Sequence, residues 1–154
     1  TSGITAFAKG GQWCNALSLL GEMLESRLSP VVASYNAGIN ACSQVGQWEW
    51  AWLLLSDIGK ATLERDAVSY SAGINACAQL GLWQHSFLLL GEMTASRVDV
   101  NSFCCSAGVN ACGTGGNWQG ALLLLMGMWE LNLEFDVVSC NSGISACEKS
   151  GQWQ

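Results

Sequence analysis

The sequence has very little proline, histidine and basic charge. Its 154 residues include one proline, Pro30, and one histidine, His85, and its 6 Lys and Arg residues are outnumbered by 12 Asp and Glu residues. The net charge of −6 is the opposite of what a nucleic-acid binder usually shows. With so few basic side chains, any bound nucleic acid would make few phosphate contacts and gain little salt-sensitive affinity.

Other features are missing as well. No apolar run of about 18 residues predicts a membrane span, and no charged start with a short apolar core predicts a signal peptide. No Cys-x-x-Cys pair occurs, and His85 has no partner at metal-ligand spacing, so we expect no metal site and no cofactor. No nucleophile, base and orienting group occur together, so we expect no enzyme activity.

A 35-residue repeat runs through the whole chain. Tryptophan recurs with this spacing, and a glycine precedes each of these tryptophans by two residues. The periodic tryptophans are Trp13, Trp48, Trp83, Trp118 and Trp153. The block Ser-Tyr-Asn-Ala-Gly-Ile-Asn-Ala-Cys at 34–42 returns in close variants at 69–77, 104–112 and 139–147. A fixed period of this size predicts a solenoid, in which each repeat contacts its neighbours.

Each repeat contains two segments with the periodicity of amphipathic helices. Ile39 and Cys42 share a face of the first segment, and Leu54 and Ile58 keep the same spacing in the second. Strand signals are absent, and Pro30 lies in a loop between repeats, where it cannot interrupt a helix. The sequence therefore predicts an all-α protein of helical hairpins, with a tight turn at Gly46-Gln47 and its equivalents. A single hairpin cannot bury its apolar side, so stability must come from stacking.

The repeats are continuous along the chain. A nearly complete repeat occupies 1–31, full repeats occupy 32–66, 67–101 and 102–136, and half a repeat occupies 137–154. No separate domain or linker interrupts them. Because the sequence begins inside a first helix and stops just past a turn, we expect a piece of a longer array.

Cysteine and tryptophan are abundant, and their spacing assigns most of them to the core. Four of the eight cysteines, Cys42, Cys77, Cys112 and Cys147, occupy one position in successive repeats. Neighbouring helices lie about 10 Å apart, too far for disulfides. So many free thiols favour a reducing compartment, an organelle matrix included. The periodic tryptophans could stack on bases, but at the start of the second helix they more readily wedge between the two helices of a hairpin.

The repeat resembles the pentatricopeptide repeat family in its pure 35-residue form. The resemblance rests on the Ser-Tyr-Asn-Ala-Gly-Ile-x-Ala-Cys opening, the Gly-Gln-Trp turn, the Ala-Leu-x-Leu-Leu-x-x-Met second helix and the Asp-Val-Val-Ser close, and it covers all 154 residues. Tetratricopeptide repeats have a unit of about 34 residues with a different pattern. The resemblance implies a right-handed α-α superhelix that binds single-stranded RNA, one nucleotide per repeat, from the 5′ end. It also implies RNA processing, editing, stability or translation in a mitochondrion or chloroplast.

The resemblance assigns base reading to two positions of each repeat. One lies near the start of the first helix, and we call the residue there the opener. The openers are Thr1, Asn36, Ser71, Ser106 and Asn141. The other is the last residue of the repeat, the closer, and the closers are Val31, Asp66, Asn101 and Asp136. A role for the Asn and Ser openers as caps of the first helix is the structural alternative, and it is compatible with base reading.

The closers differ in their hydrogen-bonding chemistry. The carboxylates of Asp66 and Asp136 only accept, which suits the imino N–H of uracil or guanine, whereas the Asn101 amide can donate to adenine or cytosine. A short Ser opener leaves room for a purine, and a longer Asn favours a pyrimidine. The pairs Asn36 with Asp66, Ser71 with Asn101, and Ser106 with Asp136 therefore predict 5′-UAG-3′, followed by a pyrimidine at Asn141. Val31 cannot hydrogen-bond through its side chain, so Thr1 with Val31 should discriminate little.

Two further sets of residues follow from the resemblance. Residues that sandwich the bases are Ala33, Val68, Phe103 and Val138, of which Phe103 should stack best. Residues at a position that often meets phosphate are Lys9 and Lys149. Gln44, Gln79 and Thr114 replace this lysine in the middle repeats, which weakens the expected affinity.

The alternative function is a helical-repeat scaffold that binds a peptide or partner protein without RNA. The acidic charge and the missing lysines favour it. The ordered opener and closer combinations favour RNA, because a peptide groove has no reason to keep base-reading pairs at positions far apart in the sequence.

Overall fold

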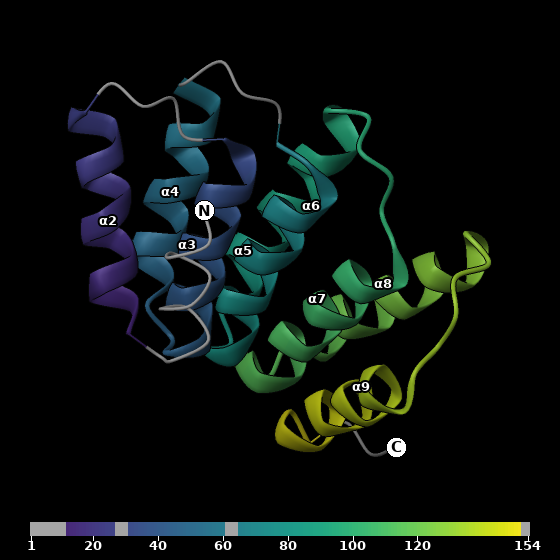
Figure 1. The fold of residues 1–154 in the computed structure, drawn as a ribbon. Helices are drawn as coiled ribbons and strands as arrows, with labels where there is room; N and C mark the ends of the chain where they lie inside the picture. Colours follow the sequence, from purple (N-terminus) through teal and green to yellow (C-terminus); the bar gives the residue numbers. More distant parts are fainter. Residues whose placement is uncertain (1–11, 27–30, 61–64, 152–154) are drawn as a thin grey trace. The chain divides into compact units, whose positions relative to one another are not determined.

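The computed structural model describes residues 12–26, 31–60 and 65–151. Over these ranges it is all-α, with eight helices of 13 or 14 residues (Figure 1). The helices are α2 (Trp13–Glu25), α3 (Val32–Gln44), α4 (Trp48–Lys60), α5 (Ala67–Gln79), α6 (Trp83–Ala95), α7 (Ser102–Gly115), α8 (Trp118–Glu130) and α9 (Val137–Lys149). The predicted helical hairpins are confirmed, and each second helix begins at a periodic tryptophan. None of these eight helices is long and apolar enough to cross a membrane.

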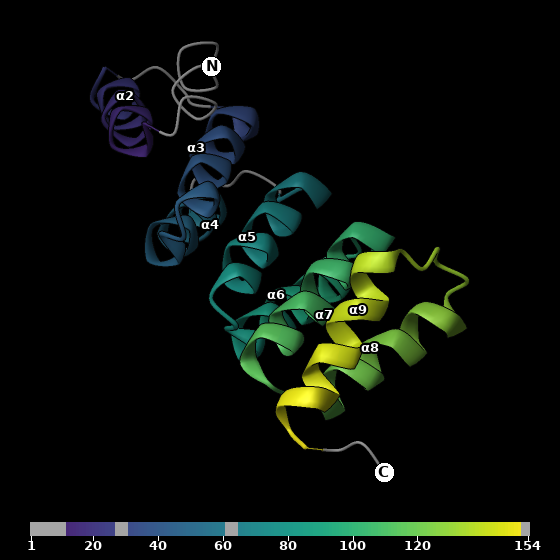
Figure 2. The same ribbon diagram turned by 90° about the horizontal axis from the view of Figure 1, so that it is seen from below.

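The chain divides into two compact units, residues 1–76 and 77–154, with the boundary inside α5. In the first unit, α3 packs against α4 of its own repeat and against α2 of the preceding repeat (Figure 1). In the second unit, α7 packs against α8 of its own repeat, α6 of the preceding repeat and α9 of the following one (Figure 2). Each unit therefore stacks hairpins on one another, as a solenoid does.

The turn inside each hairpin depends on a glycine in the left-handed region. Gly46, Gly81, Gly116 and Gly151, each two residues before a periodic tryptophan position, have φ values of 70°, 69°, 73° and 69°. Residues with a Cβ adopt this conformation only at a cost, so glycine is the residue that fits. This requirement explains why the glycine repeats with the tryptophan.

Two of the periodic tryptophans pack against the core, as the sequence predicts. In the second unit, Trp83 and Trp118 pack, partly buried, against a buried cluster that includes Val109 and Cys112. The non-periodic Trp129 is 74% exposed instead.

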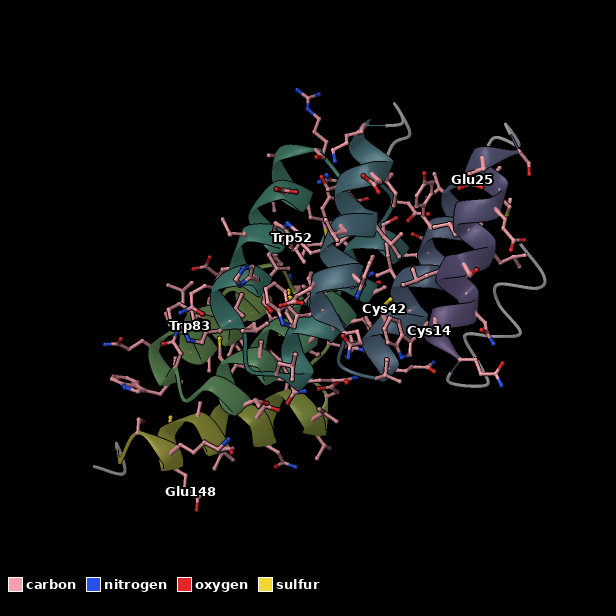
Figure 3. The ribbon with its side chains drawn as sticks, turned by 90° about the vertical axis from the view of Figure 1, so that its left-hand side faces the viewer. Cys14, Glu25, Cys42, Trp52, Trp83 and Glu148 are labelled. Atoms are coloured by element: carbon pink, nitrogen blue, oxygen red, sulfur yellow. The ribbon has the colours of Figure 1, made fainter. Side chains whose placement is uncertain are left out.

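The repeated cysteines are also core residues. Cys42, Cys77 and Cys112 are buried, and burial raises the pKa of each thiol to about 11. Their equivalent Cys147 is half-buried, and Figure 3 shows Cys42 on α3 and the exposed Cys14 on α2. All the cysteines in the described ranges are free thiols. The buried ones remain protonated at neutral pH, which makes them poor nucleophiles and metal ligands.

The close approach of α7 and α9 makes Gly113 sensitive to substitution. A Cβ at Gly113 would lie 2.5 Å from the backbone carbonyl oxygen of Ser142, so α9 would have to shift. We expect Gly113→Ala to lower the free energy of unfolding by about 2 kcal/mol. Gly127→Ala is the matched control, because a Cβ there meets no described neighbour within 4 Å, and we expect it to stabilise α8 by up to about 1 kcal/mol. Urea unfolding followed by circular dichroism measures both, and equal effects would contradict the prediction.

Candidate functional site

The described polar closers cap the first helices. Asp66, Asn101 and Asp136 each immediately precede a first helix and accept, through Oδ1, the backbone N–H three residues later, at 2.8, 2.9 and 2.6 Å. An N-cap of this kind satisfies a helix N–H that has no partner inside the helix. Val31 precedes α3 in the same way but makes no side-chain cap bond. The capping residues are therefore the closers.

The described openers lie one turn inside the first helices, so the structural alternative, in which the openers cap these helices, is wrong. Asn36 and Ser106 are buried, with 8% and 7% of their surfaces exposed. Ser71 is half-buried, and its hydroxyl donates to the backbone carbonyl of Val68 at 3.0 Å. Asn141 is exposed on α9, and Thr1 lies outside the described residues.

Asn36 and Asp66 are joined directly, although 30 residues separate them. The Asn36 amide donates from Nδ2 to Oδ1 of Asp66 at 3.1 Å and to Oδ2 at 3.4 Å. Ser69 completes the cluster, with its hydroxyl 2.6 Å from Oδ1 of Asn36 and 2.7 Å from Oδ1 of Asp66. The opener and closer of this repeat therefore form one hydrogen-bonded group.

Ser106 and Asp136 are connected through a third residue. The hydroxyl oxygens of Ser139 and Ser106 are 2.6 Å apart, and the Ser139 hydroxyl also makes a short hydrogen bond to Oδ1 of Asp136. Ser139 thus contacts Ser106 and Asp136 in the same way that Ser69 contacts Asn36 and Asp66. Both bonds from Ser139 reach Oδ1 of Asp136.

The third pair, Ser71 with Asn101, is divided between the two units. The exposed Asn101 still has a defined orientation, because its Oδ1 accepts the backbone N–H of Cys104. The Nδ2 amide group therefore points away from that N–H and keeps its two donors for another partner.

Hydrogen bonds keep both carboxylate closers ionised. Burial raises the pKa of Asp66, but the bonds from Ser69 and Asn36 outweigh it and leave the pKa below the ordinary value. The hydroxyl and backbone N–H of Ser139 lower the pKa of Asp136, and Ser106 adds a smaller effect. At neutral pH both closers are therefore pure hydrogen-bond acceptors.

The second position of each described first helix is exposed. These residues, predicted to sandwich bases, are Ala33, Val68, Phe103 and Val138. Phe103 offers the largest flat surface, with 59% of it exposed. Because each of these positions lies three residues before an opener, it is one turn away on the same helix.

Lys149 makes contacts within the protein. Its ammonium group donates to the backbone carbonyls of Gly113 at 3.0 Å and Thr114 at 3.3 Å, at the C-terminal end of α7. A cation there stabilises the helix by interacting with its dipole. A phosphate contact by Lys149 stays a prediction, and Lys9 lies outside the described residues.

Sequence reasoning missed Ser69 and Ser139. Both are fully buried at the third position of a first helix, and Ser34 and Cys104 are their equivalents. The signal was present in the repeated block, which opens with Ser or Cys at this position. A small polar residue retained at a buried helical position indicates a specific hydrogen-bond partner.

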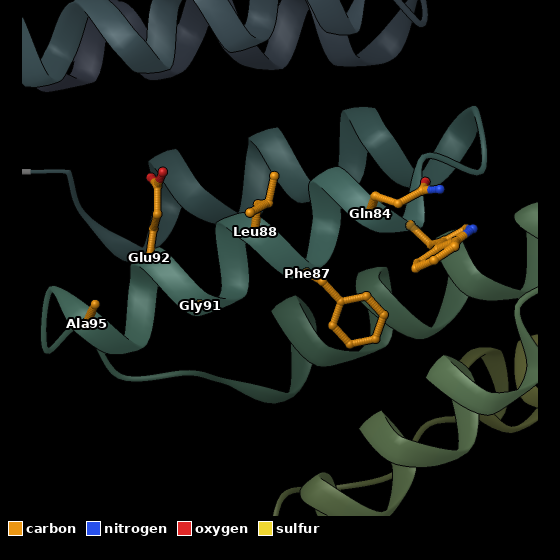
Figure 4. A pocket seen from close by; sticks show the side chains of 7 residues that line it. Gln84, Phe87, Leu88, Gly91, Glu92 and Ala95 are labelled. Carbon is orange, nitrogen blue, oxygen red and sulfur yellow. The ribbon is translucent and has the colours of Figure 1, made fainter.

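An open groove runs along one side of α6 (Figure 4). It is lined chiefly by Trp83, Phe87 and Leu88, with Gln84 and Glu92 as the polar residues. It contains none of the openers or closers, and its one charged side chain is acidic. The described ranges contain no group of His, Cys, Asp or Glu arranged to hold a metal ion.

Comparison with known proteins identifies related repeats and folds. The model of the PPR repeat family matches residues 4–28, 33–61 and 68–98, together more than half of the chain. Comparison with curated protein sequences gives no match.

Solved structures show the same fold at low sequence identity. The pentatricopeptide repeat protein PPR10, in complex with an 18-nucleotide psaJ RNA element, is 24% identical with a TM-score of 0.78, over 96% of this chain and 22% of PPR10. The PPR domain of Arabidopsis thaliana protein-only RNase P 1, in complex with tRNA, is 12% identical with a TM-score of 0.83, over 98% and 83%. PPR10 from maize, in a further structure, has a TM-score of 0.52 at 16% identity, over 96% and 26%. This chain spans about a fifth of the length of PPR10.

Proposed function

Because the chain belongs to the pentatricopeptide repeat family, we propose that it binds single-stranded RNA and reads one nucleotide with each opener and closer pair. Two solved structures with the same fold, those of PPR10 and the protein-only RNase P domain, contain bound RNA. The exposed second positions of the first helices provide surfaces on which successive bases can stack. RNA is thus the partner, and the array needs no cofactor, small-molecule substrate or catalytic group.

The observation that carries the proposal is the hydrogen bonding of each polar closer, which uses one side-chain atom to cap the following helix. One oxygen of Asp66, Asn101 or Asp136 is held by the following helix, so the other half of the side chain has a defined direction. In the aspartates this half is Oδ2, an acceptor for the N3–H of uracil or the N1–H of guanine. In Asn101 it is the Nδ2 amide, a donor for the bare ring nitrogen of adenine or cytosine.

The opener then separates purines from pyrimidines by size. The Asn36 side chain is larger than that of Ser106 and leaves less space for a base beside its closer. The repeat 32–66 therefore favours uracil, and the repeat 102–136 favours guanine. With Ser71 and Asn101 favouring adenine, the proposed core sequence is 5′-UAG-3′. Asn141 favours a pyrimidine after it, and Val31 with Thr1 adds little selectivity before it.

We further propose that the array selects RNA targets for processing, editing, stabilisation or translation in a mitochondrion or chloroplast. The array itself would contribute recognition of the RNA. A reducing organelle matrix suits the free thiols in the described ranges.

Fluorescence anisotropy tests the proposal directly. The chain would be titrated into labelled single-stranded RNAs that differ only at the three central nucleotides, at low salt because the array has few basic groups. We expect 5′-UAG-3′ to bind about tenfold more tightly than triplets with one changed base, since each mismatch leaves a polar closer group unpaired. Equal binding of all triplets would contradict base reading by these pairs. Absence of any RNA binding would favour the scaffold function instead.

A further inference from the structure

The serine at the third position of a first helix connects the opener and closer in both pairs that lie within one unit. Ser69, at the start of α5, contacts Asn36 and Asp66, and Ser139, at the start of α9, contacts Ser106 and Asp136. Both serines belong to the repeat that follows the opener, and both are fully buried. They cannot touch a base themselves, so any effect on base reading must act through their neighbours.

Ser69 contacts both Asn36 and Asp66. Its hydroxyl lies against Oδ1 of Asn36 and Oδ1 of Asp66, and its single proton can be donated to only one of these oxygens at a time. Its backbone N–H donates to Oδ1 of Asp66, and Nδ2 of Asn36 points to the carboxylate. Rotation of the amide by half a turn would bring its oxygen against the ionised carboxylate, which is repulsive. The cluster therefore presents Asp66 with Oδ2 as its most available acceptor.

Ser139 transmits the same constraint without an amide. A hydroxyl prefers to donate to an ionised acceptor, so Ser139 donates to Asp136 and Ser106 donates to Ser139. This arrangement uses the single proton of each hydroxyl. The carboxylate is then held at Oδ1 by two donors of one residue, the hydroxyl and the backbone N–H.

The pair Ser71 and Asn101 has a different residue at this position. The third-position residue of the repeat that follows Ser71 and Asn101 is Cys104, whose buried thiol is a weak hydrogen-bond donor. The opener Ser71 donates its hydroxyl to its own helix, at the Val68 carbonyl. The serine thus accompanies the two aspartate closers, and cysteine accompanies the asparagine closer.

We propose that Ser69 and Ser139 are positioning residues that set the strength of base discrimination by the neighbouring aspartate closers. They do so by holding one carboxylate oxygen at the helix terminus and by orienting the opener. This inference rests on the proposed RNA-binding function and adds to it a third residue for each aspartate closer.

The test measures discrimination at the first nucleotide of the triplet in the Ser69→Ala variant of the full chain. The ratio of dissociation constants for 5′-CAG-3′ and 5′-UAG-3′ RNAs should fall about fivefold, because Asp66 and Asn36 lose a shared partner. Discrimination at the third nucleotide, which depends on Ser139, should be unchanged. Ser34→Ala is the matched control, since Ser34 is equally buried at the same position but follows Val31, which has no polar side chain.

A second readout separates positioning from general loss of stability. Carbon-detected NMR titration of Asp66 should show a higher pKa in Ser69→Ala, because a hydrogen bond to the charged form is lost. A merely structural effect would weaken binding of both RNAs equally and leave their ratio intact. Unchanged discrimination in Ser69→Ala would overturn this inference alone. No base preference in the unaltered protein would overturn the proposed function and this inference with it.

Discussion

Replacing Asn101 with Asp is expected to change the preferred middle base from adenine to guanine. The variant should bind 5′-UGG-3′ at least tenfold more tightly than 5′-UAG-3′, reversing the preference of the unaltered chain. The amide that donates to adenine N1 becomes a carboxylate oxygen that accepts from guanine N1–H, while Ser71 still leaves room for a purine. Asp and Asn are equally good N-caps, so the bond to the Cys104 N–H and the start of α7 should be retained. Fluorescence anisotropy with the two RNAs measures the change.

Asp136→Asn provides the reciprocal control. It should change the preferred third base from guanine to adenine and leave the preferred middle base unchanged, because each closer is proposed to contact only one nucleotide. Thermal unfolding of both variants should stay close to that of the unaltered chain. If Asn101→Asp weakens all RNAs alike, or leaves adenine preferred, then Asn101 does not read the middle base.

Replacing Phe103 with Ala is expected to weaken RNA binding about tenfold or more, without changing the preferred sequence. Stacking of a base on an aromatic ring contributes about 1–3 kcal/mol and depends little on which base is stacked. Phe103 is 59% exposed at the second position of α7, so its ring is available and its removal should cost little stability. Anisotropy titrations with 5′-UAG-3′ and its single-base variants measure both affinity and preference.

Val138→Ala is the matched control for this prediction. Val138 occupies the same position of α9 with a similar exposed fraction, 58%, but has no aromatic face. We expect its replacement to change affinity by less than about threefold. An equal loss in both variants, or no loss in Phe103→Ala, would contradict a stacking role for the second position.

Three of the four basic side chains in the described ranges are bonded within the protein, and Arg97 is the fourth. Within the described ranges, Lys149 is bonded to carbonyls of α7, Lys60 pairs with Asp57 at 3.2 Å, and Arg65 donates to the Leu55 carbonyl. Groups already occupied in this way contribute less to the attraction of phosphates. The proposed RNA binding would therefore depend more on short-range contacts than on long-range charge.

Much of the fold could be predicted because its cause is local and repeated. The four described glycines that lie two residues before a periodic tryptophan have a positive φ. The apolar spacing of the two segments of each repeat is that of amphipathic helices, so turns and helices follow from neighbouring residues. The core positions of Cys42 and Trp83 follow from the same periodicity. The alternative of capping by the openers was wrong, because the pattern of residue types does not show that a helix begins immediately after the closer, one turn before the opener.

The sequence by itself determined the repeat, the helical hairpins, the family and the positions at which residues vary. It could not determine which of these positions meet, because contacts between successive repeats join residues about one repeat apart, and side-chain direction depends on how the helices pack. Tertiary structure decided that Asn36 reaches Asp66, that Ser69 and Ser139 join each pair, and that Asn101 turns its oxygen toward the helix. Each of these hydrogen bonds requires a donor to point at an acceptor from another part of the chain. Packing of the folded helices brings the two groups together and fixes their orientation.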